Sequence, residues 1–219
     1  DRSFSERLPM PDLPTLAQTF RCAGYQTYAV GKLHVYPQRD RIGFDDVMLN
    51  EEGRHHLGLA ADDYEHFLSE HGFSGLELAH GMGNNDYNVR PWHLPEYCHP
   101  TNWTAREMSR AIARRDPARP TFWYMSFNHP HPPLTPLAGY LDIYREIELG
   151  GPSVGEWAKE PECLPYALRM RRQWSGMESE ARVRMARQAF YALSTHVDHQ
   201  IRAVIGTLRE HGLHDDTVI

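Results

Sequence analysis

The chain has 219 residues, of which 41% are hydrophobic and 24% are charged, and its formal net charge is −6 at pH 7. This length and composition are typical of a soluble globular domain, and the acidic balance argues against a nucleic-acid-binding surface. No apolar run is long enough to cross a bilayer, and residues 1–7 lack the features of a secretory leader, which favours a cytoplasmic over a periplasmic location.

The first third of the sequence predicts helices alternating with a strand. Residues 14–23 have an amphipathic pattern flanked by a proline and a glycine, residue types that favour the start and the end of a helix. Residues 25–30 follow as a β-prone run, and residues 37–58 read as irregular and charged. Residues 62–70 predict a short amphipathic helix. This order is typical of α/β proteins.

The middle of the sequence predicts a long loop, a helix and a buried strand. Residues 73–100 have little periodicity, so we expect a long ordered loop. Thr104 and Glu107 have the spacing of a capping box, which predicts a helix from there to about residue 115. Residues 121–127 (TFWYMSF) are almost all apolar, as in a strand that is buried on both faces.

One long helix dominates the C-terminal third. Residues 150–178 read as loop, whereas residues 178–211 carry apolar residues every three or four positions. We expect a stripe that faces the core to run from Phe190 to Leu208. Residues 217–219 read as the start of a further strand.

Polar residues follow both of the predicted strands. Lys32 and His34 follow the first strand, and an extended chain would point both side chains to the same side. His129 and His131 follow the second strand in a proline-rich segment. If the strands are parallel, these residues meet at the edge of the sheet where α/β proteins bind ligands. Such a cluster suits a tetrahedral oxyanion, although an ordinary exposed strand end also fits the first pair.

A metal site formed by histidines is the competing interpretation. The chain has 14 histidines, and six of them cluster at residues 55–56, at 93 and 99, and at 129 and 131. No carboxylate is obviously placed beside the pair at 129–131, and the three cysteines lie far apart without CxxC spacing. The sequence therefore assigns no metal ligand within this chain.

Four stretches of the chain carry a recognisable order of motifs. Residues 13–27 read as a helix and a turn into a strand, and residues 31–34 are GKLH, followed by GFD at residues 43–45. Residues 127–133 are FNHPHPP, and residues 191–219 read as a helix leading to the start of a strand. In this order they resemble the sulfatase family of the alkaline phosphatase superfamily, with its GKxH, GFD and PHxP motifs and the segment before its SDHG motif.

The resemblance implies an α/β fold of the alkaline phosphatase type. This is a three-layer sandwich with a mainly parallel central sheet, which we expect to be incomplete here. Residues 1–219 would be the central part of a single sulfatase-like catalytic domain, an internal fragment cut at both ends.

The family's nucleophile and its metal ligands have no counterpart in this chain. The family nucleophile is a cysteine in C-x-P/A-S-R that matures to formylglycine, and the nearest stretch, CLPYA at residues 163–167, departs from that motif. The acidic residues that hold the family's divalent cation, Ca²⁺ by the same resemblance, are also missing. We expect the formylglycine and the cation ligands to belong to segments of the parent protein outside this chain.

The resemblance assigns roles to individual residues. Lys32 would contact the sulfate and the nucleophile, and His34 would contact the nucleophile's hydroxyls and help to release sulfate. His131 would sit by the bridging oxygen and favour departure of the leaving group. Three further residues, two beside the third motif and one in the long loop, are candidates for the substrate pocket: Asn128, His129 and His93.

Three functions stay open at this point. The first is hydrolysis of a small-molecule sulfate ester by the parent protein, with the 219-residue chain inactive alone. The second is a phosphonate monoester or phosphodiester hydrolase of the same superfamily. The third, from another class, is a non-catalytic module that binds anions or serves as a scaffold. We expect no nucleic-acid or membrane partner, and the sequence assigns no oligomeric state.

Overall fold

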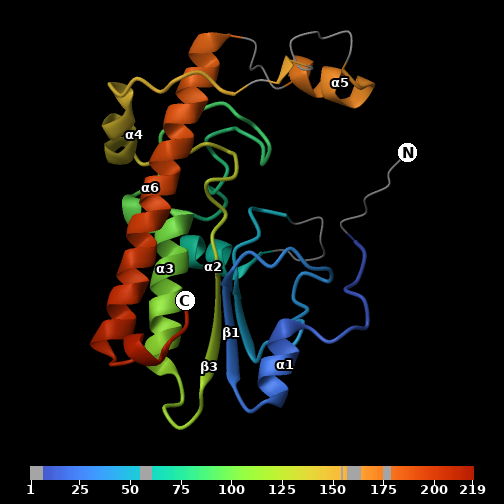
Figure 1. The fold of residues 1–219 in the computed structure, drawn as a ribbon, viewed down its shortest axis with the longest axis vertical. Helices are drawn as coiled ribbons and strands as arrows, with labels where there is room; N and C mark the ends of the chain where they lie inside the picture. Colours follow the sequence, from blue (N-terminus) through green and yellow to red (C-terminus); the bar gives the residue numbers. More distant parts are fainter. Residues whose placement is uncertain (1–6, 55–60, 154, 157–163, 175–178) are drawn as a thin grey trace. The chain divides into compact units, whose positions relative to one another are not determined.

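The computed structural model describes residues 7–54, 61–153, 155–156, 164–174 and 179–219, with the backbone alone described at residues 171–174 (Figure 1). The chain forms two compact units. The first unit consists of Asp1–Ala79, Leu94–Asn128 and Asp198–Ile219, and the second consists of His80–His93 and His129–Val197. Among the described residues, no helix is both long and apolar enough to cross a membrane.

A parallel sheet of three strands forms the centre of the first unit. The strands, in the spatial order β2-β1-β3, are β1 (Gln26–Gly31), β2 (Asp46–Leu49) and β3 (Thr121–Ser126). Gly31, the last residue of the central strand, pairs with Leu49 on one side and with Ser126 on the other. The carboxyl ends of all three strands therefore meet at one edge of the sheet.

Helices cover both faces of this sheet (Figure 1). On one face lies α1 (Leu16–Cys22), where Phe20 stacks on Phe122 of β3 with ring centroids 4.6 Å apart. The other face contacts α3 (Pro100–Arg114). The C-terminal part of α6 (Glu180–Glu210) packs on α3, where the hydroxyl of Thr207 donates a hydrogen bond to that of Ser109. The helix–sheet–helix arrangement confirms the predicted α/β class with a parallel sheet.

The start of α3 differs from the prediction. The helix begins at Pro100, and the Nδ1 atom of its N-cap, His99, accepts a hydrogen bond from the Thr101 N–H at 3.2 Å. Thr104 and Glu107 lie inside the helix and are buried, so the predicted capping box is wrong. A proline suits the first helical position because its missing N–H would have no partner there, and this signal outweighs the capping-box spacing.

The segment at 37–58 is not entirely irregular, because it contains β2. This strand has only four residues, and two aspartates precede its apolar part. Its entry is fixed by Asp45, whose Oδ2 atom accepts a hydrogen bond from the Thr27 N–H at 2.9 Å. Farther along, α2 (Asp63–Glu70) matches the predicted helix, with Asp62 and Glu65 forming a capping box.

The second unit is built around the N-terminal part of α6. Its apolar core consists of Leu134, Leu141, Ala186, Ala189, Ala192 and Leu193. Two shorter helices, α4 (Ala138–Arg145) and α5 (Tyr166–Trp174), belong to this unit, and α5 corrects the prediction of loop at 150–178. Phe190 is 46% exposed, so the stripe predicted to face the core does not include it.

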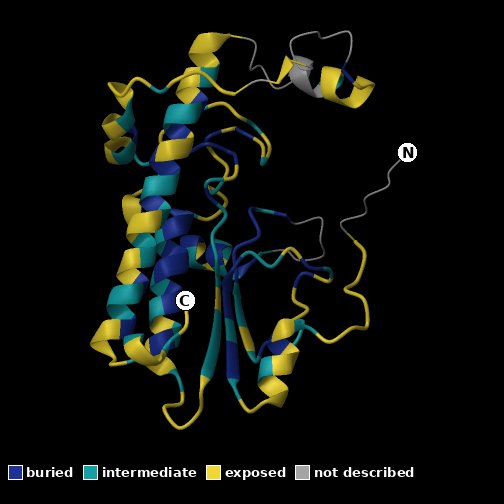
Figure 2. Cartoon of the chain, viewed as in Figure 1, coloured by how far each residue is buried: buried dark blue, intermediate teal, exposed yellow. Residues whose placement is uncertain are grey.

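Burial of the strands is uneven (Figure 2). β1 is buried along almost its whole length, whereas β3 is of intermediate exposure, so the expectation of burial on both of its faces is wrong. The physical reason is that among the described residues β3 is an edge strand with a neighbour on one side only. Residues 217–219 form no strand and follow a short 3-10 helix, His214–Asp216.

Candidate functional site

Polar residues follow all three strands of the first unit at the edge where the strands end. They are Lys32 and His34 after β1, Asn50, Glu51, Glu52 and Arg54 after β2, and Asn128 after β3. The carboxyl edge of a parallel sheet is the usual ligand site of an α/β fold. This edge is therefore the candidate site in the first unit.

The chain does not stay extended after β1. Gly31 has a φ of +107° and His34 a φ of +56°, both in the left-handed region. The alternation argument that put Lys32 and His34 on the same side therefore fails, because it requires an extended chain. The two side chains are instead connected through residues that follow β2.

A cluster built around the buried side chains of Glu52 and Arg54 makes this connection. The Oε2 atom of Glu52 lies 2.7 Å from Nζ of Lys32 and 3.3 Å from Nη2 of Arg54. Nη1 of the same guanidinium lies 2.8 Å from Nδ1 of His34. The side chains of Glu52 and Arg54 are only 7% and 9% exposed. Two cations share one carboxylate oxygen, so these three charged groups carry a net positive charge at the strand ends.

Glu51 holds the backbone of the candidate site. Its Oε1 atom accepts hydrogen bonds from the N–H groups of Leu33 at 2.7 Å and His34 at 2.9 Å. Its own N–H donates to Oδ2 of Asp62 at 2.6 Å. Burial raises the pKa of the Glu51 carboxyl, and the two backbone N–H groups oppose that shift. The chain after β1 is therefore tied to the turn after β2 and to the N-terminus of α2.

Two asparagines join the ends of β2 and β3. The Nδ2 group of Asn128 donates to Oδ1 of Asn50 at 2.8 Å. Among the described residues, three buried atoms here have no hydrogen-bond partner: Asn50 Nδ2, Glu51 Oε2 and Asn128 Oδ1. Buried polar atoms almost always have a partner in folded proteins. These atoms give the edge a capacity to bind a polar group.

The second unit holds the histidines that follow β3 in sequence. Burial, with neighbouring His196, lowers the pKa of His129 to about 3, so this side chain is neutral. Its Nε2 atom lies 3.3 Å from the Thr135 hydroxyl. The Nδ1 atom of His131 lies 2.6 Å from the carbonyl oxygen of Pro132. Since a carbonyl only accepts, Nδ1 of His131 carries a proton, and Nε2 is the atom whose protonation can change.

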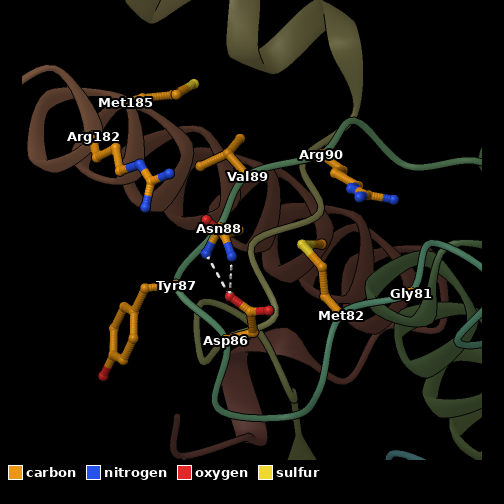
Figure 3. A pocket seen from close by; sticks show the side chains of 9 residues that line it. All are labelled: Gly81, Met82, Asp86, Tyr87, Asn88, Val89, Arg90, Arg182 and Met185. Atoms are coloured by element: carbon orange, nitrogen blue, oxygen red, sulfur yellow. Dashed lines mark hydrogen bonds between the residues drawn. The ribbon is translucent and has the colours of Figure 1, made fainter. Parts of the chain in front are cut away.

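His93 packs against other aromatic rings of the second unit. Its ring centroid lies 5.3 Å from that of His80 and 4.9 Å from that of Trp92. Burial lowers the pKa of His80, and neighbouring His93 adds to this effect. A cavity of about 450 Å³ in this unit is lined by the loop at 81–90 and by two residues of α6, Arg182 and Met185 (Figure 3). None of the predicted site residues lines it.

The structure thus divides the predicted residues into two groups. Lys32, His34 and Asn128 lie at one sheet edge of the first unit, whereas His93, His129 and His131 belong to the second unit. The residues that organise the first group were not predicted from the sequence: Asn50, Glu51, Glu52 and Arg54. The signal that could have found them is the polar run directly after the apolar part of β2. The histidines at residues 55–56 and Cys163 lie outside the described residues.

The described residues do not fit a metal ion or a formylglycine. No group of three or more histidine, cysteine or acidic side chains in the described part of the chain could hold a metal. The described cysteines are Cys22, which is exposed, and Cys98, which is buried, and neither stands in a C-x-P/A-S-R sequence. At this edge the described chain contributes cations, amides and a histidine.

Comparison with known sequences relates the whole chain to one family. The profile of the sulfatase family matches residues 3–219. An arylsulfatase of Clostridium perfringens (strain 13 / Type A) is 34% identical in an alignment 224 residues long that covers 93% of this chain and 44% of the relative. A choline-sulfatase of Rhizobium meliloti (strain 1021) is 26% identical, over 94% of this chain and 41% of the relative. The chain thus spans less than half the length of these relatives.

Solved structures resemble the fold. A phosphonate monoester hydrolase of Agrobacterium radiobacter superposes with a TM-score of 0.68 at 18% identity, covering 97% of this chain and 47% of that structure. The phosphonate monoester hydrolase SpPMH of Silicibacter pomeroyi gives a TM-score of 0.62 at 20% identity, covering 98% and 48%. Likeness at this level of identity concerns the fold, and it confirms the alkaline-phosphatase-like α/β architecture expected from the motifs.

Proposed function

Because the chain belongs to the sulfatase family, we propose that the whole protein of which it is part hydrolyses small-molecule sulfate esters. The observation that carries the proposal is the cation pair at the strand ends, where Lys32 and Arg54 share one carboxylate oxygen of Glu52. The likeness to an arylsulfatase at 34% identity supports a sulfate ester as the substrate. Residues 1–219 would form the central part of a single catalytic domain, which here packs as two compact units.

Lys32 would supply fixed positive charge for the sulfate. Its ammonium is a compact point charge that is 17% exposed, so it meets an anion in a partly desolvated setting. One preorganised donor aimed at developing negative charge contributes roughly 3–4 kcal/mol to transition-state stabilisation. Asn50 would add a hydrogen bond to the sulfate through its unpartnered Nδ2 group, whereas the unpartnered Oδ1 of Asn128 can only accept one.

His131 would serve the leaving group. Its Nδ1 proton is engaged with the Pro132 carbonyl, so Nε2 is the atom that would transfer a proton to the departing oxygen. This role rests on the resemblance of the segment at 127–133 to the family's PHxP motif. Asn128, His129 and His93 remain candidates for substrate contacts, although the neutral state of His129 limits it to hydrogen bonding and packing.

The family's formylglycine and divalent cation, Ca²⁺ by resemblance, would come from other segments of the whole protein. The described residues offer neither a suitable cysteine nor a group of metal ligands. This chain covers 44% of the related arylsulfatase, which leaves ample length for such segments. Because neither group fits the residues present, the roles above involve only this chain's own side chains.

Substitution of Lys32 tests the proposal. In the whole protein, Lys32→Ala should lower kcat/KM on an aryl sulfate by about 10²-fold or more, because it removes fixed charge from the anion site. Arg39→Ala is the matched control, since it also removes a cation from an ion pair, with Asp63, in the first unit. The control should stay near the wild-type value. A loss of less than about threefold for Lys32→Ala would exclude the proposed role.

A phosphonate monoester hydrolase is the second candidate, favoured by the two solved structures with that activity in their names. Matched sulfate and phosphonate esters with the same leaving group distinguish the two. We expect faster turnover of the sulfate ester, and the reverse order would favour the second candidate. Binding of sulfate without turnover of either ester would favour a non-catalytic anion-binding module.

A further inference from the structure

The cavity of the second unit has the size of a small-molecule site. It lies between the loop at 81–90 and the first turns of α6, and its volume of about 450 Å³ is within the range of ligand pockets (Figure 3). Met82, Val89 and Met185 supply the apolar part of its wall. A ligand with an apolar body would therefore find contacts on both the loop and the helix.

The loop that forms one side of the cavity is ordered by its own hydrogen bonds. The N–H of Met82 donates to Nδ1 of His80 at 3.1 Å, and the N–H of Asp86 donates to the carbonyl oxygen of Gly83 at 2.9 Å. Oδ1 of Asp86 accepts from the N–H of Asn88 at 2.9 Å and from its Nδ2 group at 2.6 Å (Figure 3). The wall of the cavity is thus formed before a ligand arrives, which lowers the entropic cost of binding.

The charged side chains of the cavity favour an anion. Two arginines, Arg90 and Arg182, line it together with one acidic residue, Asp86, so that the lining carries a net positive charge. Nη1 of Arg90 donates to the carbonyl oxygen of His80, a neutral partner that orients the guanidinium and leaves its charge in place. A guanidinium fixed in this way presents its other N–H groups in the fork geometry that matches a carboxylate.

The backbone ties the cavity to the segment that carries His131. Val89, in the cavity wall, forms a parallel β-bridge with Leu134, and the N–H of Arg90 donates to the Leu134 carbonyl at 3.2 Å. Leu134 follows His131 by three residues, a stretch that spans at most about 11 Å. Both belong to the second unit. Because His131 is the residue proposed to serve the departing oxygen, the cavity beside it is placed to receive the alcohol part of the ester.

We propose that this cavity binds the alcohol part of the sulfate ester and selects alcohols that carry a carboxylate on an apolar body. Arg90 and Arg182 would bind the carboxylate, and Met82, Val89 and Met185 would contact the apolar body. The inference rests on the proposed function, since it assigns the cavity a part of that substrate. Arg90 and Arg182 are specificity-determining residues and take no part in cleavage of the ester bond.

Two aryl sulfates that differ in one group test the preference. Their ring carries either a –CH₂–COO⁻ or a –CH₂–CONH₂ substituent, and the methylene insulates the ring so that the two leaving groups are alike. In the whole protein, we expect kcat/KM to be roughly tenfold or more higher for the acid than for the amide, because hydrogen bonds to a charged group are the stronger ones. A ratio near one, or a preference for the amide, overturns the proposal.

Substitution of the arginines tests the assignment to this cavity. Arg90→Gln and Arg182→Gln should each lower the acid-to-amide ratio about threefold or more, whereas a general loss of activity would affect both esters equally and leave the ratio unchanged. Arg184→Gln is the matched control, since Arg184 is an exposed arginine of α6 that does not line the cavity, and it should keep the wild-type ratio. An unchanged ratio in both cavity variants overturns the proposal. If Arg90→Gln does not fold, Arg182→Gln decides, because its side chain is exposed on a helix.

Binding of the free phenols separates the cavity from the reaction. Isothermal titration calorimetry of the whole protein with 4-hydroxyphenylacetate and 4-hydroxyphenylacetamide needs no turnover and no sulfate. We expect the acid to bind roughly tenfold or more tightly, and Arg182→Gln to reduce that difference. Equal affinities overturn the proposal. Preference for the acid in a protein that hydrolyses no sulfate ester would refute the proposed function and leave the carboxylate site in place.

Discussion

At the scale of single residues, burial sets the charge of two side chains in opposite directions. It lowers the pKa of His129 to about 3 and raises the pKa of Asp62 to about 6, against backbone hydrogen bonds from Glu51 and Glu65. Both shifts disfavour the charged form. In acid the two shifts change the free energy of unfolding in opposite directions. As the pH falls, the unfolded chain takes up a proton on the histidine before the folded chain does, whereas the folded chain takes up a proton on the Asp62 carboxyl before the unfolded chain does.

His129 should make the free energy of unfolding depend on pH. The unfolded histidine takes up a proton near pH 6.5, but the folded one does so only near pH 3, so its stabilising contribution is present above about pH 6.5 and is lost towards about pH 3. Between about pH 6.5 and pH 5 the loss is about 2 kcal/mol for one proton. His129→Gln should remove this dependence, as measured by chemical denaturation at each pH.

The comparison of variants isolates His129 from Asp62, which is present in both proteins. His211→Gln is the matched control, because His211 is an exposed histidine after the end of α6 and should leave the pH slope unchanged. Equal slopes for the wild type and His129→Gln would show that His129 is protonated in the folded state at mildly acidic pH.

At the scale of elements, Gly31 lets the central strand approach β3 at the candidate site. Its φ is +107°, and a Cβ atom at this position would lie 1.8 Å from the carbonyl oxygen of Ser126. The same carbonyl accepts a hydrogen bond from the N–H of Lys32 at 3.2 Å. The glycine thus allows the chain to turn out of the sheet and deliver Lys32 to the strand ends.

Gly31→Ala should therefore destabilise the whole protein by at least about 3 kcal/mol, because a left-handed conformation and a clash with backbone combine. Gly83→Ala is the matched control, since nothing lies within 4 Å of a Cβ at that position and its φ is not in the left-handed region. Chemical denaturation of both variants measures the difference. A change below about 1 kcal/mol for Gly31→Ala would mean that the strands separate easily at this point.

The elements with strong local signals could be predicted from the sequence, and those set by tertiary contacts could not. The helix at α1, the strands β1 and β3 and the long helix α6 have clear periodicity or apolar runs. β2 is too short for periodicity, and its entry depends on the contact between Asp45 and Thr27, which no local pattern reveals. For the start of α3, the sequence offers two competing local signals, Pro100 and the spacing of Thr104 and Glu107.

Residues of the candidate site could likewise be predicted only where they follow an element with a strong local signal. Lys32, His34 and Asn128 follow strands that the sequence shows clearly, so their place at the sheet edge could be expected. Glu52 and Arg54 follow the strand that was missed, and their link to the first two residues depends on the pairing of β1 with β2. Motif resemblance does not reveal such a link, because the motifs cover each stretch separately.

At the scale of the whole molecule, the outer edge of β3 is the feature that the described chain leaves open. β3 is largely apolar, yet all its residues are of intermediate or full exposure, and Tyr124 is 41% exposed. Among the described residues, β3 pairs only with β1. An apolar strand with an unpaired edge is a template for association with another chain. The related arylsulfatase is more than twice as long, so we expect the whole protein to cover this strand.

The 219-residue chain alone should therefore self-associate, and Tyr124→Lys should reduce that association, because charge at an exposed edge opposes strand pairing. In the whole protein the same substitution should lower the free energy of unfolding by roughly 1–3 kcal/mol, since it would bury a lysine. Tyr166→Lys is the matched control, because Tyr166 is an exposed tyrosine on a helix, and it should change neither quantity. Analytical ultracentrifugation and chemical denaturation measure the two effects. A 219-residue chain that stays monomeric would contradict the expected self-association. An unchanged free energy of unfolding for Tyr124→Lys in the whole protein would show that β3 is an edge of the complete sheet.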